Sequence, residues 1–75
     1  MMELQIKLFA TLREGRGKVL TKEFPSPATP KLVLETLNID EKDVAILLVN
    51  GVDGNLDQEL QEGDVLSIFP PVGGG

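Results

Sequence analysis

The chain has 75 residues and a formal net charge of −5, with twelve acidic and seven basic side chains. A sequence of this length forms a single domain with a thin core. It contains no Cys and no His, which excludes a disulfide scaffold and a zinc–thiolate site and removes the commonest general base near neutral pH. The acidic balance also argues against nucleic acid as a partner, because nucleic-acid binding usually needs a basic face. The composition therefore favours a protein-binding partner or carrier over an autonomous enzyme.

The opening segment MMELQIKLFA has no basic region followed by a long apolar stretch, so we expect no signal peptide. No apolar run approaches the ~20 residues that cross a bilayer. We therefore expect a cytoplasmic protein with no membrane partner.

The first predicted elements form a hairpin. Residues 3–10 (ELQIKLFA) alternate between apolar and polar side chains, which is typical of a half-buried strand. Residues 11–18 contain two glycines and predict a turn, and residues 19–24 (VLTKEF) predict a second strand.

A helix and two further strands follow. Thr29 and then Pro30 form a helix start, a hydroxyl N-cap before a proline at the first helical position, and we expect the helix to run over residues 30–37 and stop at Asn38. The almost unbroken apolar run in residues 43–51 predicts a strand covered on much of both faces. Residues 50–55 (NGVDGN) have the composition of a turn, and residues 56–64 form a connecting segment. Residues 65–69 (VLSIF) predict the last strand.

This order predicts an α+β domain in which one main helix packs on a mixed sheet of four to five strands. A hairpin, a crossing helix and then more strands is the order of the β-grasp, or ubiquitin-like, fold. We expect the domain to occupy residues 1–69, with residues 70–75 forming a flexible tail.

Two aromatic residues fall on the outer face of the predicted sheet. Phe9 shares its face with polar neighbours, and Phe69 shares its face with Ser67 if Leu66 and Ile68 point to the core. In a β-grasp sheet the first and last strands are parallel neighbours, so we expect both rings to lie together where the tail leaves. Aromatic residues are enriched in interface cores, so Phe9 and Phe69 are candidate partner-binding residues.

The tail has a chemical interpretation. Pro70 and Pro71 lack N–H donors and favour an extended exit from the sheet, and the chain from Phe69 to Gly75 reaches roughly 20 Å at ~3.3 Å per residue. Glycines can pass through a channel that side chains would block. The unhindered carboxylate of Gly75 is a candidate for activation as an acyl adenylate by another enzyme.

The segment IFPPVGGG, residues 68–75, resembles the C-terminus of the small subunit of molybdopterin synthase, a ubiquitin-like sulfur carrier of the MoaD/ThiS-like group. Those subunits end in an apolar or aromatic pair, Pro-Pro-Val, a variable residue and Gly-Gly, and Gly73 fills the variable position. Residues 6–17 (IKLFATLREGRG) resemble their first strand and the turn after it. The segments VNG (49–51) and EGDVLSIFPP (62–71) fall in the same order, so the resemblance covers the whole chain.

The resemblance implies a role as a non-catalytic subunit with no bound cofactor or metal. A partner adenylyltransferase uses ATP to activate Gly75, and a sulfur donor converts it to a thiocarboxylate. The tail, comprising Pro70, Pro71, Val72, Gly73 and Gly74, then inserts into the large synthase subunit, where sulfur passes to a pterin precursor of the molybdenum or tungsten cofactor. In the family, positions matching Phe9 and Phe69 contact the partner.

Other interpretations stay open. The chain is also compatible with a sulfur carrier for thiamine thiazole synthesis, with a ubiquitin-like modifier that forms isopeptide bonds, and with a β-grasp interaction module whose tail is inert. Arg13 and Glu14 are candidates for forming the turn or contacting a partner, and over these two roles we favour a solvated one, the usual state of surface charges. The loop at residues 51–56, which carries Asp53, is not assigned to the interface.

Overall fold

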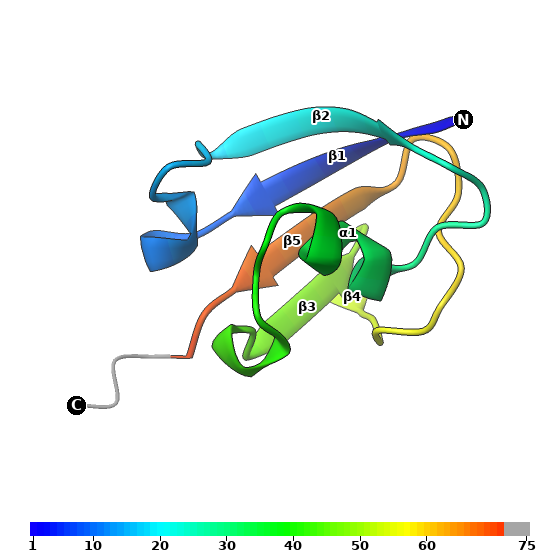
Figure 1. The fold of residues 1–75 in the computed structure, drawn as a ribbon. Helices are drawn as coiled ribbons and strands as arrows, with labels where there is room; N and C mark the ends of the chain where they lie inside the picture. Colours follow the sequence, from blue (N-terminus) through cyan, green and yellow to red (C-terminus); the bar gives the residue numbers. More distant parts are fainter. Residues whose placement is uncertain (72–75) are drawn as a thin grey trace.

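The computed structural model describes residues 1–71 (Figure 1). Their elements in chain order are β1 (Met2–Leu8), η1 (Ala10–Arg13), β2 (Val19–Phe24), α1 (Pro30–Thr36), η2 (Glu41–Asp43), β3 (Ile46–Val49), β4 (Val52–Asp53) and β5 (Val65–Phe69), where η marks a 3-10 helix. The last predicted strand ends at Phe69 as expected. The rest of the predicted tail, residues 72–75, lies outside the described residues.

The strands form one mixed sheet in the order β2-β1-β5-β3-β4. β1 and β5 are parallel, and the other three neighbouring pairs are antiparallel. The arrowheads of β1 and β5 therefore point to the same end of the molecule, where the chain leaves the sheet (Figure 1). This topology is the β-grasp fold predicted from the element order.

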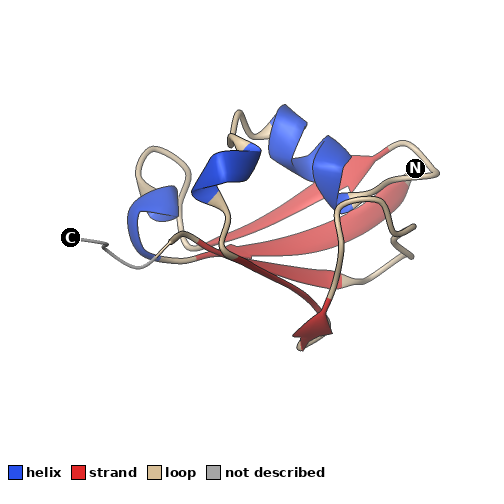
Figure 2. Ribbon diagram, turned by 90° about the horizontal axis from the view of Figure 1, so that it is seen from below, coloured by secondary structure: helices blue, strands red, loops and turns tan. Residues whose placement is uncertain are grey.

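α1 lies on one face of the sheet and leaves the other face uncovered (Figure 2). The helix begins as predicted, with Thr29 as its N-cap: the Thr29 hydroxyl oxygen accepts a hydrogen bond from the Leu32 N–H at 3.2 Å. Its end is set by Asn38, whose φ of +61° is the left-handed conformation that closes a helix. Beyond it, the Ile39 N–H donates to the Leu34 carbonyl at 2.9 Å, which satisfies a carbonyl of the last turn.

The core fills the space between α1 and the covered face of the sheet. Each strand contributes its inward-facing alternate residues, and the helix contributes one stripe. The largest fully buried side chains are Leu4, Ile6, Leu8, Pro30, Val33, Leu34, Leu66 and Ile68. The apolar alternation in β1 and β5 therefore predicted the core face correctly.

The strand predicted at residues 43–51 is shorter than expected, and it is covered on one face only. Asp40 accepts a hydrogen bond from the Lys42 N–H, which turns residues 41–43 into η2, and β3 begins only at Ile46. Leu47 and Val49 are buried, but Ile46 is 48% exposed because no helix covers its face. The unbroken apolar run concealed this difference between the two faces.

The turn predicted at residues 50–55 contains a short strand. Asn50 and Gly51 both have positive φ, of +54° and +83°, which is the backbone of a two-residue hairpin turn with the favoured Asn-Gly pair. That turn brings Val52 opposite Val49 and so forms β4. Two residues are too few for alternation to reveal a strand in the sequence.

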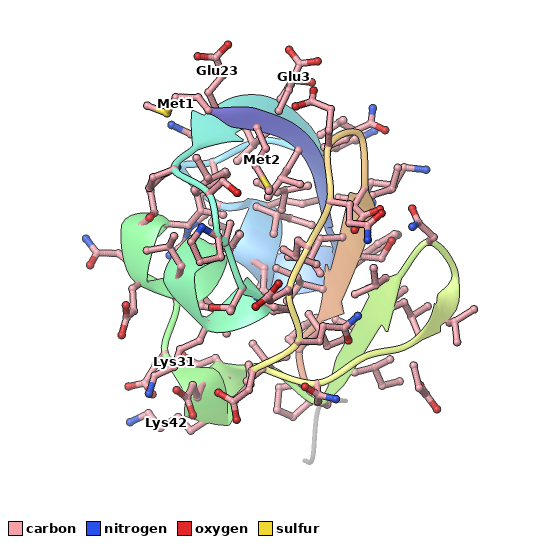
Figure 3. All side chains as sticks on the ribbon, turned by 90° about the vertical axis from the view of Figure 1, so that its right-hand side faces the viewer. Met1, Met2, Glu3, Glu23, Lys31 and Lys42 are labelled. Carbon is pink, nitrogen blue, oxygen red and sulfur yellow. The ribbon has the colours of Figure 1, made fainter. Side chains whose placement is uncertain are left out.

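The far end of the open face places like charges opposite one another. Glu3 and Glu23 are direct cross-strand partners and project side by side (Figure 3). A Glu62 carboxylate oxygen also accepts from the Glu3 N–H at 3.1 Å, so a third acid lies close by. Like charges in direct cross-strand pairs are destabilising.

We expect Glu23→Lys to raise the free energy of unfolding by about 0.2–1 kcal/mol, since it converts this repulsion into an attraction. Urea unfolding followed by far-ultraviolet circular dichroism measures the change. Glu14→Lys makes the same charge change at an exposed position outside the strands and is the control. Equal stabilisation by both variants would show that net charge, and not the Glu3–Glu23 pair, is responsible.

Candidate functional site

Two stacked phenylalanines form the centre of the candidate site. Leu8 in β1 lies opposite Ile68 in β5, so the next residue of each parallel strand, Phe9 and Phe69, emerges on the open face side by side. Their ring centroids lie 4.1 Å apart with an interplanar angle of 9°. Both side chains are half-buried. The juxtaposition predicted from strand parity is confirmed.

Arg13 is not the solvated side chain that we expected. Its Nε donates to the Leu8 carbonyl at 2.8 Å, and its guanidinium carbon lies 5.4 Å from the centre of the Phe9 ring. The cause is η1, which turns the chain back over the end of β1 directly after Phe9. Arg13 therefore restrains one of the two aromatic residues, with a cation–π contribution, whereas Glu14 is exposed as expected.

A second arginine holds η1 to the helix. Arg16 donates from Nε to the Leu37 carbonyl at 3.1 Å, from Nη2 to the Asn38 carbonyl at 3.2 Å, and from Nη1 to the Leu12 carbonyl at 3.2 Å. Hydrogen bonds from a charged donor are stronger than neutral ones, and these satisfy carbonyls at the C-terminal end of α1. The turn that carries Arg13 is thus fixed at both ends. No sequence pattern indicated this long-range contact.

Ile46 extends the aromatic pair into an apolar cleft. It is the direct partner of Phe69 in the antiparallel β3–β5 pair. Its place on the open face was not predicted, because the uniformly apolar run of β3 does not show which side chains face outward. The cleft is lined by Phe9, Ala10, Thr11, Ile46, Phe69, Pro70 and Pro71.

The chain leaves the sheet at this cleft. The Phe69 carbonyl accepts from the Ala45 N–H at 2.8 Å, so hydrogen bonding with the neighbouring segment continues to the end of β5. Pro70 then has no N–H to donate. Pro70 is half-buried and Pro71 is exposed. The other predicted tail residues, Val72, Gly73, Gly74 and Gly75, lie outside the described residues.

Over residues 1–71, no group of three acidic side chains is placed to hold a metal ion. Within the same residues, no helix is long and apolar enough to cross a membrane. What the site presents is an apolar, aromatic surface beside the departing chain, which suits contact with another protein.

The mixed sheet on one helix, with its aromatic surface beside the last strand, defines a ubiquitin-like β-grasp domain. The sequence model of the ThiS family matches residues 6–75. The protein belongs to the ThiS family. A comparison with curated proteins finds no match.

Solved structures give the same result. A candidate molybdopterin converting factor subunit 1 from Pyrococcus furiosus is 28% identical with a TM-score of 0.80, and the match covers 96% of this chain and 100% of that one. Small archaeal modifier protein 1 from Haloferax volcanii is 25% identical with a TM-score of 0.82, covering 96% and 100%. Subunit 1 of the Helicobacter pylori molybdopterin-converting factor, solved with its subunit 2, shares the fold at 24% identity and a TM-score of 0.68, covering 99% and 100%. The family and fold confirm the resemblance to MoaD/ThiS-like carriers.

Proposed function

We propose that this protein is the sulfur carrier of molybdenum or tungsten cofactor biosynthesis, acting as the small subunit of molybdopterin synthase. The observation that carries the proposal is the aromatic cleft of Phe9 and Phe69 at the point where Pro70 leads the chain out of the sheet. Membership of the ThiS family and the likeness to a molybdopterin converting factor subunit support it.

The proposed reaction takes place at the carboxylate of Gly75. One carboxylate oxygen attacks the α-phosphorus of ATP in the partner adenylyltransferase, which forms an acyl adenylate and releases pyrophosphate. Hydrosulfide supplied by the sulfur donor attacks the acyl carbon, AMP leaves, and a thiocarboxylate is formed. The sulfur then passes to the pterin precursor, and water restores the carboxylate. ATP binds to the partner, and this chain supplies the docking surface and the reactive end.

The second proposed partner is the large subunit of molybdopterin synthase. The Helicobacter pylori relative was solved in complex with its subunit 2, and a similar complex is proposed here. A tail without bulky side chains after Val72 suits insertion into the active site of such a subunit.

The pathway is tested by supplying acceptors to the thiocarboxylated chain. With the large synthase subunit and the pterin precursor, we expect a dithiolene-containing pterin and return of the carboxylate. A parallel reaction contains the thiazole-forming enzyme of thiamine synthesis. Sulfur transfer only in the parallel reaction would reject the molybdopterin pathway and leave the carrier chemistry in place.

A protein modifier is the second candidate function, and the likeness to a small archaeal modifier protein favours it. In that case the adenylated terminus is attacked by a lysine amine and forms an isopeptide bond. A tagged chain incubated with the adenylyltransferase, ATP and cell extract would then form conjugates that resist reducing agents. An inert interaction module would form neither conjugates nor a thiocarboxylate.

A further inference from the structure

The strand registers arrange the open face of the sheet in rows. The row nearest the departing chain consists of Phe9, Phe69 and Ile46, which are neighbours across β1, β5 and β3. The next row crosses all five strands. In the order β2 to β4 it consists of Val19, Lys7, Ser67, Leu48 and Asp53.

Charged side chains of opposite sign lie on the two sides of these rows. Lys7 and Arg13 lie at the β1 end, and Arg13 contacts Phe9 directly. Asp53 lies at the β4 end, where it lines a groove together with Ile46 and Glu41. The apolar row is therefore bounded by two cations on one side and two carboxylates on the other.

None of these four charged groups belongs to an ion pair among the described residues, although Arg13 donates to the Leu8 carbonyl and contacts the Phe9 ring. In the part of the chain that the structure describes, the one ion pair joins Asp40 and Lys42, at 4.0 Å. Asp53 and Glu41 are exposed, and Lys7 and Arg13 are half-exposed. Ile46, which belongs to both the apolar cleft and the acidic groove, makes the two surfaces continuous.

We propose that this charge polarity fixes the orientation in which the protein docks on its adenylyltransferase. The partner surface would present an apolar patch with an acidic group opposite Lys7 and Arg13 and a basic group opposite Glu41 and Asp53. Complementary charges across an interface set its register and speed encounter more than they raise affinity. The wrong orientation would place like charges against each other and turn the departing chain away from the ATP site. The partner itself rests on the proposed function.

A charge-neutral reversal separates polarity from net charge. Lys7→Glu lowers the net charge of −5 by two and Asp53→Lys raises it by two, so the double variant keeps −5. Both positions are at least partly exposed, and thermal unfolding checks that the fold is kept. The matched control is Lys31→Glu with Glu35→Lys on α1, a reversal of the same kind on the covered side of the sheet.

The association rate with the adenylyltransferase is measured by stopped flow at low salt and again at about 1 M salt, where the Debye length is ~3 Å. We expect the K7E/D53K variant to associate about tenfold more slowly than the native chain at low salt and to approach the native rate at high salt. The K31E/E35K control is expected to keep the native association rate at both salt concentrations. Native rates for K7E/D53K would overturn the inference, and the proposed function would stand. If the native chain itself does not bind the adenylyltransferase, the proposed function fails and the inference fails with it.

Discussion

Replacing Phe69 with Ala is expected to weaken binding to the adenylyltransferase about 30-fold or more, equivalent to about 2 kcal/mol. Truncating an aromatic anchor at the centre of an interface typically costs this much. Phe69 supplies half of the stacked pair and also borders Ile46 and Pro70 in the apolar cleft. Its side chain is half-buried, so the domain should remain folded.

The two rings should also behave as one unit. Phe9→Ala removes the same stacking contact, so the double variant is expected to lose less binding free energy than the sum of the two single losses. Titration calorimetry on the four proteins measures this coupling. Val19→Ala is the control, because Val19 is 50% exposed on the same open face but lies at the edge strand β2. Additive losses, or an equal loss for Val19→Ala, would contradict a shared aromatic docking site.

The second large effect concerns folding. Ile68→Ala is expected to lower the free energy of unfolding by about 2–5 kcal/mol, because it leaves a cavity in a packed core. Ile68 is 0% exposed and lies between Leu8 and Leu47 on the two neighbouring strands. A chain of this length has a total stability of about 4–11 kcal/mol at roughly 0.05–0.15 kcal/mol per residue. The variant should therefore lose a large share of its stability, and it should be only marginally folded where the total lies at the low end of this range.

Ile46→Ala is the matched control for this change. It deletes the same atoms on the adjacent strand, but Ile46 is 48% exposed and packs beside Phe69 on the open face. We expect it to change stability by less than about 1 kcal/mol and to weaken partner binding instead. Chemical denaturation compares the two variants. Equal destabilisation would mean that the open face is a second core and not a docking surface.

The sequence predicted the candidate site where two simple rules apply. Alternation in β1 and β5 placed Leu66 and Ile68 inward and the two phenylalanines outward, and parallel pairing of those strands brought the rings together. Both rules depend only on the two-residue period of a strand and on the β-grasp order. The start of the helix at Thr29 was also predictable from a short segment, because a hydroxyl cap and the proline that follows it act within one helical turn.

The parts that sequence reasoning missed depend on contacts between distant segments. Arg16 reaches the end of α1, more than twenty residues further along the chain, and nothing in its own segment signals that contact. The sequence around Arg13 suggests a surface charge, and its contact with the Phe9 ring becomes clear only in the structure, where η1 places the guanidinium over that ring. Ile46 was concealed because a uniformly apolar strand does not distinguish its two faces. The polarity of the open face likewise appears only when the strand registers are known.

The most direct test of the carrier function is the intact mass of the chain after incubation with its adenylyltransferase, ATP and a sulfide source. A variant lacking Gly74 and Gly75 is treated in parallel. We predict that one C-terminal oxygen is replaced by sulfur in the full chain, and that the truncated chain is unchanged. An unchanged mass for the full chain, with an adenylyltransferase shown to be active, would contradict the account and favour an inert interaction module.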